Sequence, residues 1–201
     1  MMEKLISFLL GVASSIVASA TLKFLGVYYR VIPPKYRKSF DREFKNQHKA
    51  LKSIKRDAEK SETLRVIAMK GDTFSNPGDS GELHDFLING RPNKQKYLIS
   101  DPDNPYVIKR GVELNNTNLK MGIQNSLGCF NEIANQNANI IIRKHKEILR
   151  FRLIIFDESL YISFQSTTSI GRLSPMQRYI KGSSGYSALE AYFEDLWAKY
   201  E

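Results

Sequence analysis

The first apolar stretch of the chain, residues 5–22, contains no charged side chain. As an α-helix its 18 positions would extend about 27 Å, close to the hydrocarbon thickness of a bilayer, which is about 30 Å. The pattern predicts a single transmembrane anchor over residues 1–32. Two alternatives remain open: a buried core helix, and a signal peptide cleaved near Ala18-Ser19-Ala20.

Small side chains recur at every fourth position of this stretch, at Gly11, Ser15 and Ser19. Such a stripe lets helices approach closely in lipid, so it predicts a homodimer or higher oligomer. Residues 23–56 carry 11 Lys and Arg against 2 Asp and Glu. By the positive-inside rule, this excess predicts a single-pass protein of the inner (cytoplasmic) membrane, with its N-terminus outside and its C-terminal domain in the cytoplasm.

The next segment, residues 33–62, combines helical apolar spacing with many cations. Pro33-Pro34 would end the first helix, and the pattern over residues 35–60 predicts a second, basic connector helix. Its apolar positions fit a short coiled-coil seam, or an amphipathic face lying on the bilayer or on its own domain. We expect the cations to contact the anionic headgroups of the lipid bilayer. They begin with Lys35, Arg37 and Lys38 and continue with Arg42, Lys45, Lys49, Lys52, Lys55 and Arg56.

Residues 63–201 alternate between β-like and helical patterns. Runs of β-branched and aromatic residues predict strands, and apolar spacings of three or four predict helices. The last helix is expected to begin with a capping box, Ser187-x-x-Glu190. The alternation and a late hairpin predict an α/β domain with a sheet of mixed direction. Expected strands cover 63–70, 94–100, 140–143, 150–156, 160–164 and 176–180, and expected helices cover 81–88, 106–114, 117–135 and 187–200.

The formal net charge of +9 is concentrated near the N-terminus. Residues 1–60 contain 13 Lys and Arg against 5 Asp and Glu, whereas residues 61–201 contain 17 against 16. No base-stacking aromatic side chains alternate with the connector cations, so a nucleic-acid partner is not expected. Cys129 is the single cysteine, and His84 has no His or Cys at ligand spacing. Neither a metal nor a cofactor is therefore expected.

The order and spacing of four stretches resemble phospholipase D-like domains. The resemblance implies a phospholipase D-like mixed sheet flanked by helices. In that family two copies of His-x-Lys-x4-Asp meet in one active site, where one His attacks phosphorus and the other protonates the leaving group. Here the single motif position holds Arg150, Arg152 and Asp157, so a complete site would need a dimer. The four stretches are VIAMKGDTF (66–74), YLISDPDNPYV (97–107), FRLIIFDESLYISF (151–164) and KGSSGYSALEAYFEDLW (181–197).

Arg150 and Arg152 lie two positions apart on an expected strand and so share one face. Two guanidinium groups can clamp an anion, but neither can act as a nucleophile or general acid near neutral pH. We therefore assign no catalytic residue and expect a pseudo-active site for a phosphate-bearing ligand such as a nucleotide. The alternative is structural pairing, for example of Arg152 with Asp157. Strand-end loops would complete the site with Lys70, Gly71, Asp72, Thr73 and Asp101.

These features together predict a membrane-anchored sensor or effector that is not an enzyme. Its degenerate phospholipase D-like domain would bind a ligand or a cytosolic protein partner and so control association of the anchor. Small anchored proteins of this layout resemble membrane effectors of bacterial antiviral defence. The alternatives are a membrane-anchored phosphodiesterase or nuclease, and a passive tether that recruits a cytosolic partner.

Overall fold

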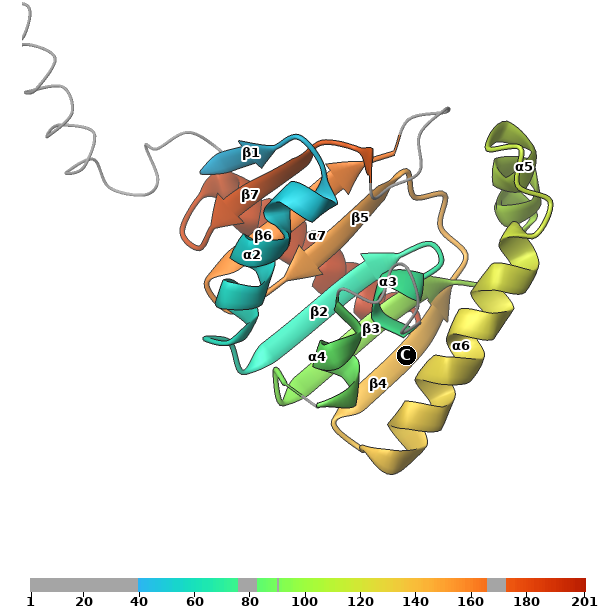
Figure 1. Ribbon diagram of the computed structural model, residues 1–201, viewed down its shortest axis with the longest axis horizontal. Coiled ribbons are helices and arrows are strands. Elements are labelled where there is room, and N and C mark those ends of the chain that lie inside the picture. The colour runs from blue at the N-terminus through green and yellow to red at the C-terminus, as the bar shows by residue number, and fades with distance from the viewer. Residues whose placement is uncertain (1–39, 76–82, 90, 166–172) are drawn as a thin grey trace, which may run out of the picture. The chain divides into compact units, whose positions relative to one another are not determined.

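A computed structural model describes residues 40–75, 83–89, 91–165 and 173–201 (Figure 1). Within these ranges the strands form one seven-stranded sheet of order β1-β7-β6-β5-β2-β3-β4. The strands are β1 (Arg42–Phe44), β2 (Thr63–Ala68), β3 (Lys94–Ser100), β4 (Ile140–His145), β5 (Phe151–Ile155), β6 (Ser159–Phe164) and β7 (Met176–Ile180). The helices are α2 (Gln47–Ala58), α3 (Asp72–Ser75), α4 (His84–Ile88), α5 (Pro105–Glu113), α6 (Leu119–Gln136) and α7 (Ser184–Lys199).

The direction of the strands changes at the centre of the sheet. Strands β2, β3 and β4 are parallel to one another, and β5 pairs antiparallel with β2. Strands β6, β7 and β1 continue the sheet in antiparallel pairs. The carboxyl ends of β2, β3 and β4 therefore share one edge of the sheet with the beginning of β5. The expected α/β architecture with a mixed sheet is present.

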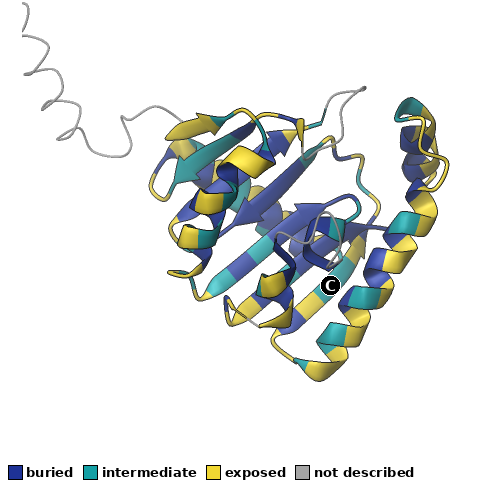
Figure 2. Ribbon diagram, viewed as in Figure 1, coloured by how far each residue is buried: buried dark blue, intermediate teal, exposed yellow. Residues whose placement is uncertain are grey.

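Two apolar cores lie on opposite faces of this sheet. On one face, residues of α2 and α6 such as Ile54 and Phe130 pack against Val66 and Tyr97 of the strands. On the other face, α7 packs its aromatic side chains, including Trp197, against the sheet. Figure 2 shows the buried strand centres between the exposed outer surfaces of α2 and α6. Each fully buried side chain of this kind contributes roughly 1.5–3 kcal/mol of hydrophobic stabilisation.

The expected continuous helix over residues 35–60 is wrong in its described part. Residues 42–44 form β1, which pairs antiparallel with β7. Helix α2 begins only after Asn46, whose side chain accepts a hydrogen bond from the Lys49 backbone N–H at 3.0 Å. Ala50 and Ile54 of α2 are fully buried in the core. The apolar face of the helix therefore lies on its own domain and forms neither a coiled-coil seam nor a bilayer-facing surface.

The expected fold class also needs correction at its N-terminal part. No helix within the described ranges has the length and apolar character needed to span a membrane. The expectation of an α/β domain preceded by a transmembrane helix is therefore wrong for the described part of the chain. The segment that suggested it lies outside the described residues, as do Lys35, Arg37 and Lys38 and the stripe of Gly11, Ser15 and Ser19.

Local hydrogen bonding moves two of the expected helix boundaries. Helix α7 begins three residues before the expected capping box, because Ser183 Oγ accepts a hydrogen bond from the Tyr186 backbone N–H at 3.2 Å. The short helix α3, which follows β2, was expected to be a loop. It places the Thr73 side chain beneath the edge where β2 ends and β5 begins.

Candidate functional site

A sharp turn carries the chain from the end of β2 into α3. Gly71 has a φ of +77°, a conformation that side-chain-bearing residues rarely adopt. A Cβ atom there would lie 2.8 Å from Ile99 Cδ1 and 2.8 Å from Phe130 Cε2. The Gly71 carbonyl accepts a hydrogen bond from the Phe74 N–H at 2.9 Å and so begins α3. Glycine is therefore needed at this position to bring α3 against the sheet.

The centre of the candidate site is Arg152, the second residue of β5. Its side chain is buried, with 7% of the residue's surface exposed. Nη1 donates a hydrogen bond to Thr73 Oγ1 at 3.2 Å. Within the described residues, Nε and Nη2 have no hydrogen-bond partner. A buried guanidinium group thus retains an edge of unused donors.

A second unused polar group lies directly across the sheet ladder from Arg152. Ser163 of β6 is its antiparallel partner in the register. The Ser163 Oγ is buried and, like Nε of Arg152, has no hydrogen-bond partner among the described residues. Opposed residues on antiparallel strands project from the same face, so both polar groups belong to one locality.

Burial also determines the electrostatics of Arg152. Desolvation lowers the pKa of Arg152 to about 10, and the negative charge of Asp72 acts in the opposite direction. The guanidinium group therefore remains positively charged at neutral pH. A buried charge without an ion-pair partner is unfavourable by several kcal/mol in order of magnitude. An anion seated against Nε and Nη2 would remove that penalty.

Lys70 and Asp72 form the more exposed part of the same site. Lys70 Nζ lies 3.2 Å from Asp72 Oδ2, and about a third of each side chain is exposed. The stem of Lys70 crosses α6 at Gly122, where an added Cβ would lie only 2.7 Å from Lys70 Cε. The structure therefore brings together Lys70, Gly71, Asp72, Thr73 and Arg152 from the predicted set.

Arg150 shares the strand face but is held by a different partner. Its Nη2 donates to Glu113 of α5 at 3.0 and 3.3 Å. The hydrogen bond from Arg110 lowers the pKa of Glu113, and the charge of Arg150 acts in the same direction. Arg150 is therefore the more exposed arginine of an ion-pair group with Glu113 and the buried Arg110, and the structure does not show it closing on Arg152.

Asp101 stabilises the loop that leads from β3 into α5. Its backbone N–H donates to the His145 carbonyl at 2.8 Å, and its Oδ1 accepts from the Asp103 N–H at 3.1 Å. These contacts join the carboxyl ends of β3 and β4. Asp101 thus supports the edge of the sheet, and no contact links its carboxylate to Arg152 among the described side chains.

Asp157 lies at the other end of the strand and is not part of the site. Its Oδ2 accepts hydrogen bonds from the backbone N–H groups of Glu62 at 2.6 Å and Thr63 at 3.4 Å, and its Oδ1 accepts from Thr63 Oγ1. Burial acts to raise the pKa of Asp157, but the hydrogen bonds from Thr63 and Glu62 prevail and lower it. The carboxylate therefore ties the β5–β6 turn to the start of β2. The alternative pairing of Arg152 with Asp157 is wrong.

His145 occupies the opposite face of the sheet from Arg152. The residue is completely buried, its ring lies near Tyr200 of α7, and Ser100 Oγ is 3.4 Å from its Nε2. Burial lowers the pKa of His145 to about 4. The imidazole is therefore neutral near pH 7, and the sheet separates it from the arginine site.

Sequence reasoning missed Ser163 and the α5 contact of Arg150. The period of two along β6 could have placed Ser163 on the same face as Tyr161. It could not have identified Arg152 as the residue opposite, because that depends on the register of the β5–β6 pair.

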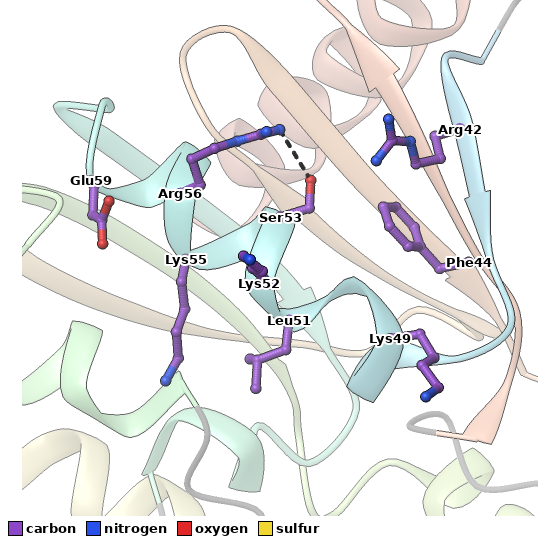
Figure 3. Close-up of a pocket in the computed structure, with 9 residues that line it drawn as sticks. All are labelled: Arg42, Phe44, Lys49, Leu51, Lys52, Ser53, Lys55, Arg56 and Glu59. Carbon is purple, nitrogen blue, oxygen red and sulfur yellow. Dashed lines mark hydrogen bonds between the residues drawn. The ribbon is translucent and has the colours of Figure 1, made fainter.

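A second cationic feature lies between β1 and α2, away from Arg152. An open pocket of about 760 Å³ lies between two residues of β1, Arg42 and Phe44, and the outer side of α2 (Figure 3). Its lining is largely basic. The residues are Arg42, Phe44, Lys49, Leu51, Lys52, Ser53, Lys55, Arg56 and Glu59.

Comparison with known proteins leaves the family of the chain open. No family model matches the sequence, and no curated protein matches it. Among solved structures, the chain is similar to TrmBL2, an archaeal chromatin protein whose structure shows a novel mode of DNA binding. The TM-score is 0.47 at 13% identity, over 94% of this chain and 63% of that one. This chain thus spans less than two thirds of that protein, and the likeness assigns neither a family nor a function.

Proposed function

We propose that this chain carries a non-catalytic binding site for a phosphate-bearing ligand at the carboxyl edge of its sheet. The observation that carries the proposal is the buried guanidinium group of Arg152, whose Nε and Nη2 have no partner among the described residues. Nε and Nη2 form one edge of the guanidinium plane. Two parallel donors on such an edge match two oxygens of a phosphate or carboxylate group.

The neighbouring side chains favour phosphate as the bound group. The hydroxyl of Thr73 already contacts the guanidinium group, and the hydroxyl of Ser163 is buried without a partner. Hydroxyl groups can donate to the remaining phosphate oxygens. Lys70 adds a partly exposed ammonium group, which can leave its ion pair with Asp72 and bind a ligand oxygen. The ligand would therefore enter past Lys70 and end against Arg152.

The same residues argue against hydrolysis. An arginine with a pKa of about 10 remains protonated near neutral pH, so Arg152 is neither a nucleophile nor a general base. His145, which could perform either role chemically, is buried on the other face of the sheet. Binding without turnover is thus the function that this chemistry supports.

The proposal includes the predicted kinship with phospholipase D-like domains. That resemblance places Arg150 and Arg152 where the family has its His and Lys, so a phosphate subsite would persist after loss of the nucleophile. It also includes the predicted regulatory role, in which ligand binding controls a protein partner. The membrane anchor is not part of the proposal.

Thermal denaturation with inorganic phosphate and a panel of mononucleotides tests this function. We expect these ligands to raise the melting temperature of the wild-type chain at pH 7, because binding to the folded state alone stabilises it. Arg152→Met should lose the response, whereas Arg150→Met, the matched control, should retain it. Equal responses of the wild type and Arg152→Met, or hydrolysis of a phosphodiester by the purified chain, would refute the proposal.

A further inference from the structure

We propose that the pocket between β1 and α2, defined by the nine lining residues given above, binds the backbone of a single-stranded nucleic acid. Figure 3 shows the lysine and arginine side chains of α2 and β1 that line this pocket. The site is separate from Arg152 and does not depend on the phosphate-ligand proposal. It reverses the expectation from the sequence that nucleic acid is not a partner.

The cations form a continuous group on one side of the helix. Lys49, Lys52 and Lys55 follow at intervals of three residues, and Arg56 lies seven residues after Lys49. At 3.6 residues per turn these four positions fall within about a third of the helix circumference. Arg42 on β1 supplies a fifth cation to the same pocket. A chain of phosphates could therefore meet several positive charges in succession.

Most of these charges have no ion-pair partner in the part of the chain that the structure describes. Among the described residues, no carboxylate forms an ion pair with Lys49, Lys52 or Lys55, while Arg56 contacts Asp57 at 3.5 Å. Asp57, the acidic residue within α2, also lies 2.8 Å from Arg178, so Arg56 shares its carboxylate with a second arginine. Among the described residues that line the pocket, Glu59 is the only acidic one. The outer side of α2 therefore has a surplus of positive charge facing an open volume.

The shape and composition favour a nucleic-acid strand over a membrane surface. A helix that binds a bilayer inserts an apolar face, but Ala50 and Ile54 are buried in the core of the domain. The apolar lining residues Phe44 and Leu51 are half-buried and pack against that core. The cations are exposed or half-exposed around an open pocket, which an extended strand can enter.

Phe44 adds a feature that a simple anion site would not need. Its ring lines the pocket between the β1 and α2 walls, with the Arg42 guanidinium 5.9 Å from the ring centroid. Sites for single-stranded nucleic acid commonly combine a positively charged groove with an aromatic ring on which a base stacks. The pocket, at about 760 Å³, is also larger than one inorganic phosphate needs.

Fluorescence anisotropy of the full chain with labelled 20-nucleotide oligo(dT) and oligo(rU), at several salt concentrations, tests the proposal. The triple variant Lys49→Gln, Lys52→Gln, Lys55→Gln should bind at least tenfold more weakly. The slope of log K against log salt should fall in magnitude by about 2, because three phosphate contacts are lost. Phe44→Leu should weaken binding with little change in that slope.

A control triple variant separates this pocket from net charge. Lys94→Gln, Lys109→Gln, Lys144→Gln removes the same charge from exposed positions elsewhere, and should bind like the wild type. If the pocket triple variant does not fold, the single variants Lys49→Gln and Lys52→Gln each give a smaller loss in the same assay.

Three results would overturn the inference. The first is absence of oligonucleotide binding by the wild type at 50 mM salt. The second is equal weakening by the two triple variants. The third is a pocket triple variant that loses binding to vesicles of phosphatidylcholine and phosphatidylserine while keeping its affinity for oligonucleotide, because the cations would then serve a lipid surface.

Discussion

Arg152 of β5 donates a hydrogen bond to Thr73 of α3 at 3.2 Å. Within the described residues this is the only hydrogen bond that the buried guanidinium group of Arg152 makes. The contact links the beginning of one central strand to the short helix that follows another. No carboxylate among the described side chains forms an ion pair with this group, although the charge of Asp72 favours its protonated form. A group arranged in this way lowers stability unless a ligand completes it.

Arg152→Met should make the ligand-free domain more stable. Methionine has a similar length and carries no charge, so the desolvation penalty disappears. We expect the free energy of unfolding to rise by about 1–3 kcal/mol at pH 7 in phosphate-free buffer. Urea denaturation followed by circular dichroism measures this change. A loss of stability would show that the guanidinium group is a structural element rather than a ligand site.

Thr73→Val should act in the opposite direction. The substitution keeps the side-chain volume but removes the oxygen that accepts from Arg152, which costs about 1–3 kcal/mol when the donor stays buried. In the Arg152→Met background the same change should be nearly neutral. The four proteins form a double-mutant cycle, and additive effects in urea denaturation would contradict a coupling between the two side chains.

Gly71→Ala should destabilise the domain strongly. The φ of +77° is strained for alanine, and its Cβ would lie 2.8 Å from Ile99 and Phe130. We expect a loss of about 2–4 kcal/mol. Gly128→Ala in α6 is the matched control, because no atom lies within 4 Å of the added Cβ. That control should gain about 0.5–1 kcal/mol from helix propensity, and an equal loss in both variants would refute the account of the turn.

Asp57 should contribute to stability at neutral pH and lose that contribution in acid. Burial acts to raise its pKa, but hydrogen bonds from Tyr161 at 2.6 Å, Ser159 at 2.7 Å and Arg178 prevail and lower it. The stabilisation by the ionised Asp57 carboxylate is complete above pH 3.8, the ordinary pKa of the group. It disappears as the pH falls through the lower pKa that Asp57 has in the folded state. Asp57→Asn should cost about 3 kcal/mol at pH 7, whereas Glu59→Gln should have little effect. Denaturation at pH 7 and pH 3 checks both, and a constant difference between the wild type and Asp57→Asn would contradict this.

His145 should produce a separate loss of stability at mildly acidic pH. Burial lowers its pKa from 6.5 to about 4, so the unfolded chain binds the proton more readily. The contribution of the neutral imidazole to the free energy of unfolding is complete above pH 6.5. It decreases as the pH falls toward 4, by roughly 3 kcal/mol over the full range. His145→Gln should flatten the profile between pH 6.5 and 5. An unchanged slope in that variant would show that other groups cause the effect.

Most strands were predictable because their signals, a β-branched and aromatic composition and the alternation of apolar and polar positions, lie within the strand's own sequence. Expected strands at residues 94–100 and 176–180 match β3 and β7 at both ends. Residues 42–44 were placed in a helix, because their pairing with β7 depends on a partner more than 130 positions away. Helical spacing also continues across Asn46, so periodicity alone could not locate the cap that begins α2.

The candidate site was predictable only in part for the same reason. Lys70, Asp72 and Thr73 were expected in one site with Arg152 because binding clefts in α/β sheets lie at the carboxyl ends of strands. Arg150 and Arg152 looked equivalent from their spacing, yet only Arg152 is buried, because Glu113 of α5 holds Arg150 at the surface. Asp157 matched a motif position but lies at the other end of β5, where it bonds to the start of β2.

A crystal structure of the chain grown with inorganic phosphate tests the central claim most directly. The account predicts a phosphate group within hydrogen-bonding distance, about 2.7–3.2 Å, of both Nε and Nη2 of Arg152, and no such group in Arg152→Met crystals. Phosphate bound only at exposed lysines, with Nε and Nη2 of Arg152 still without partners, would contradict it.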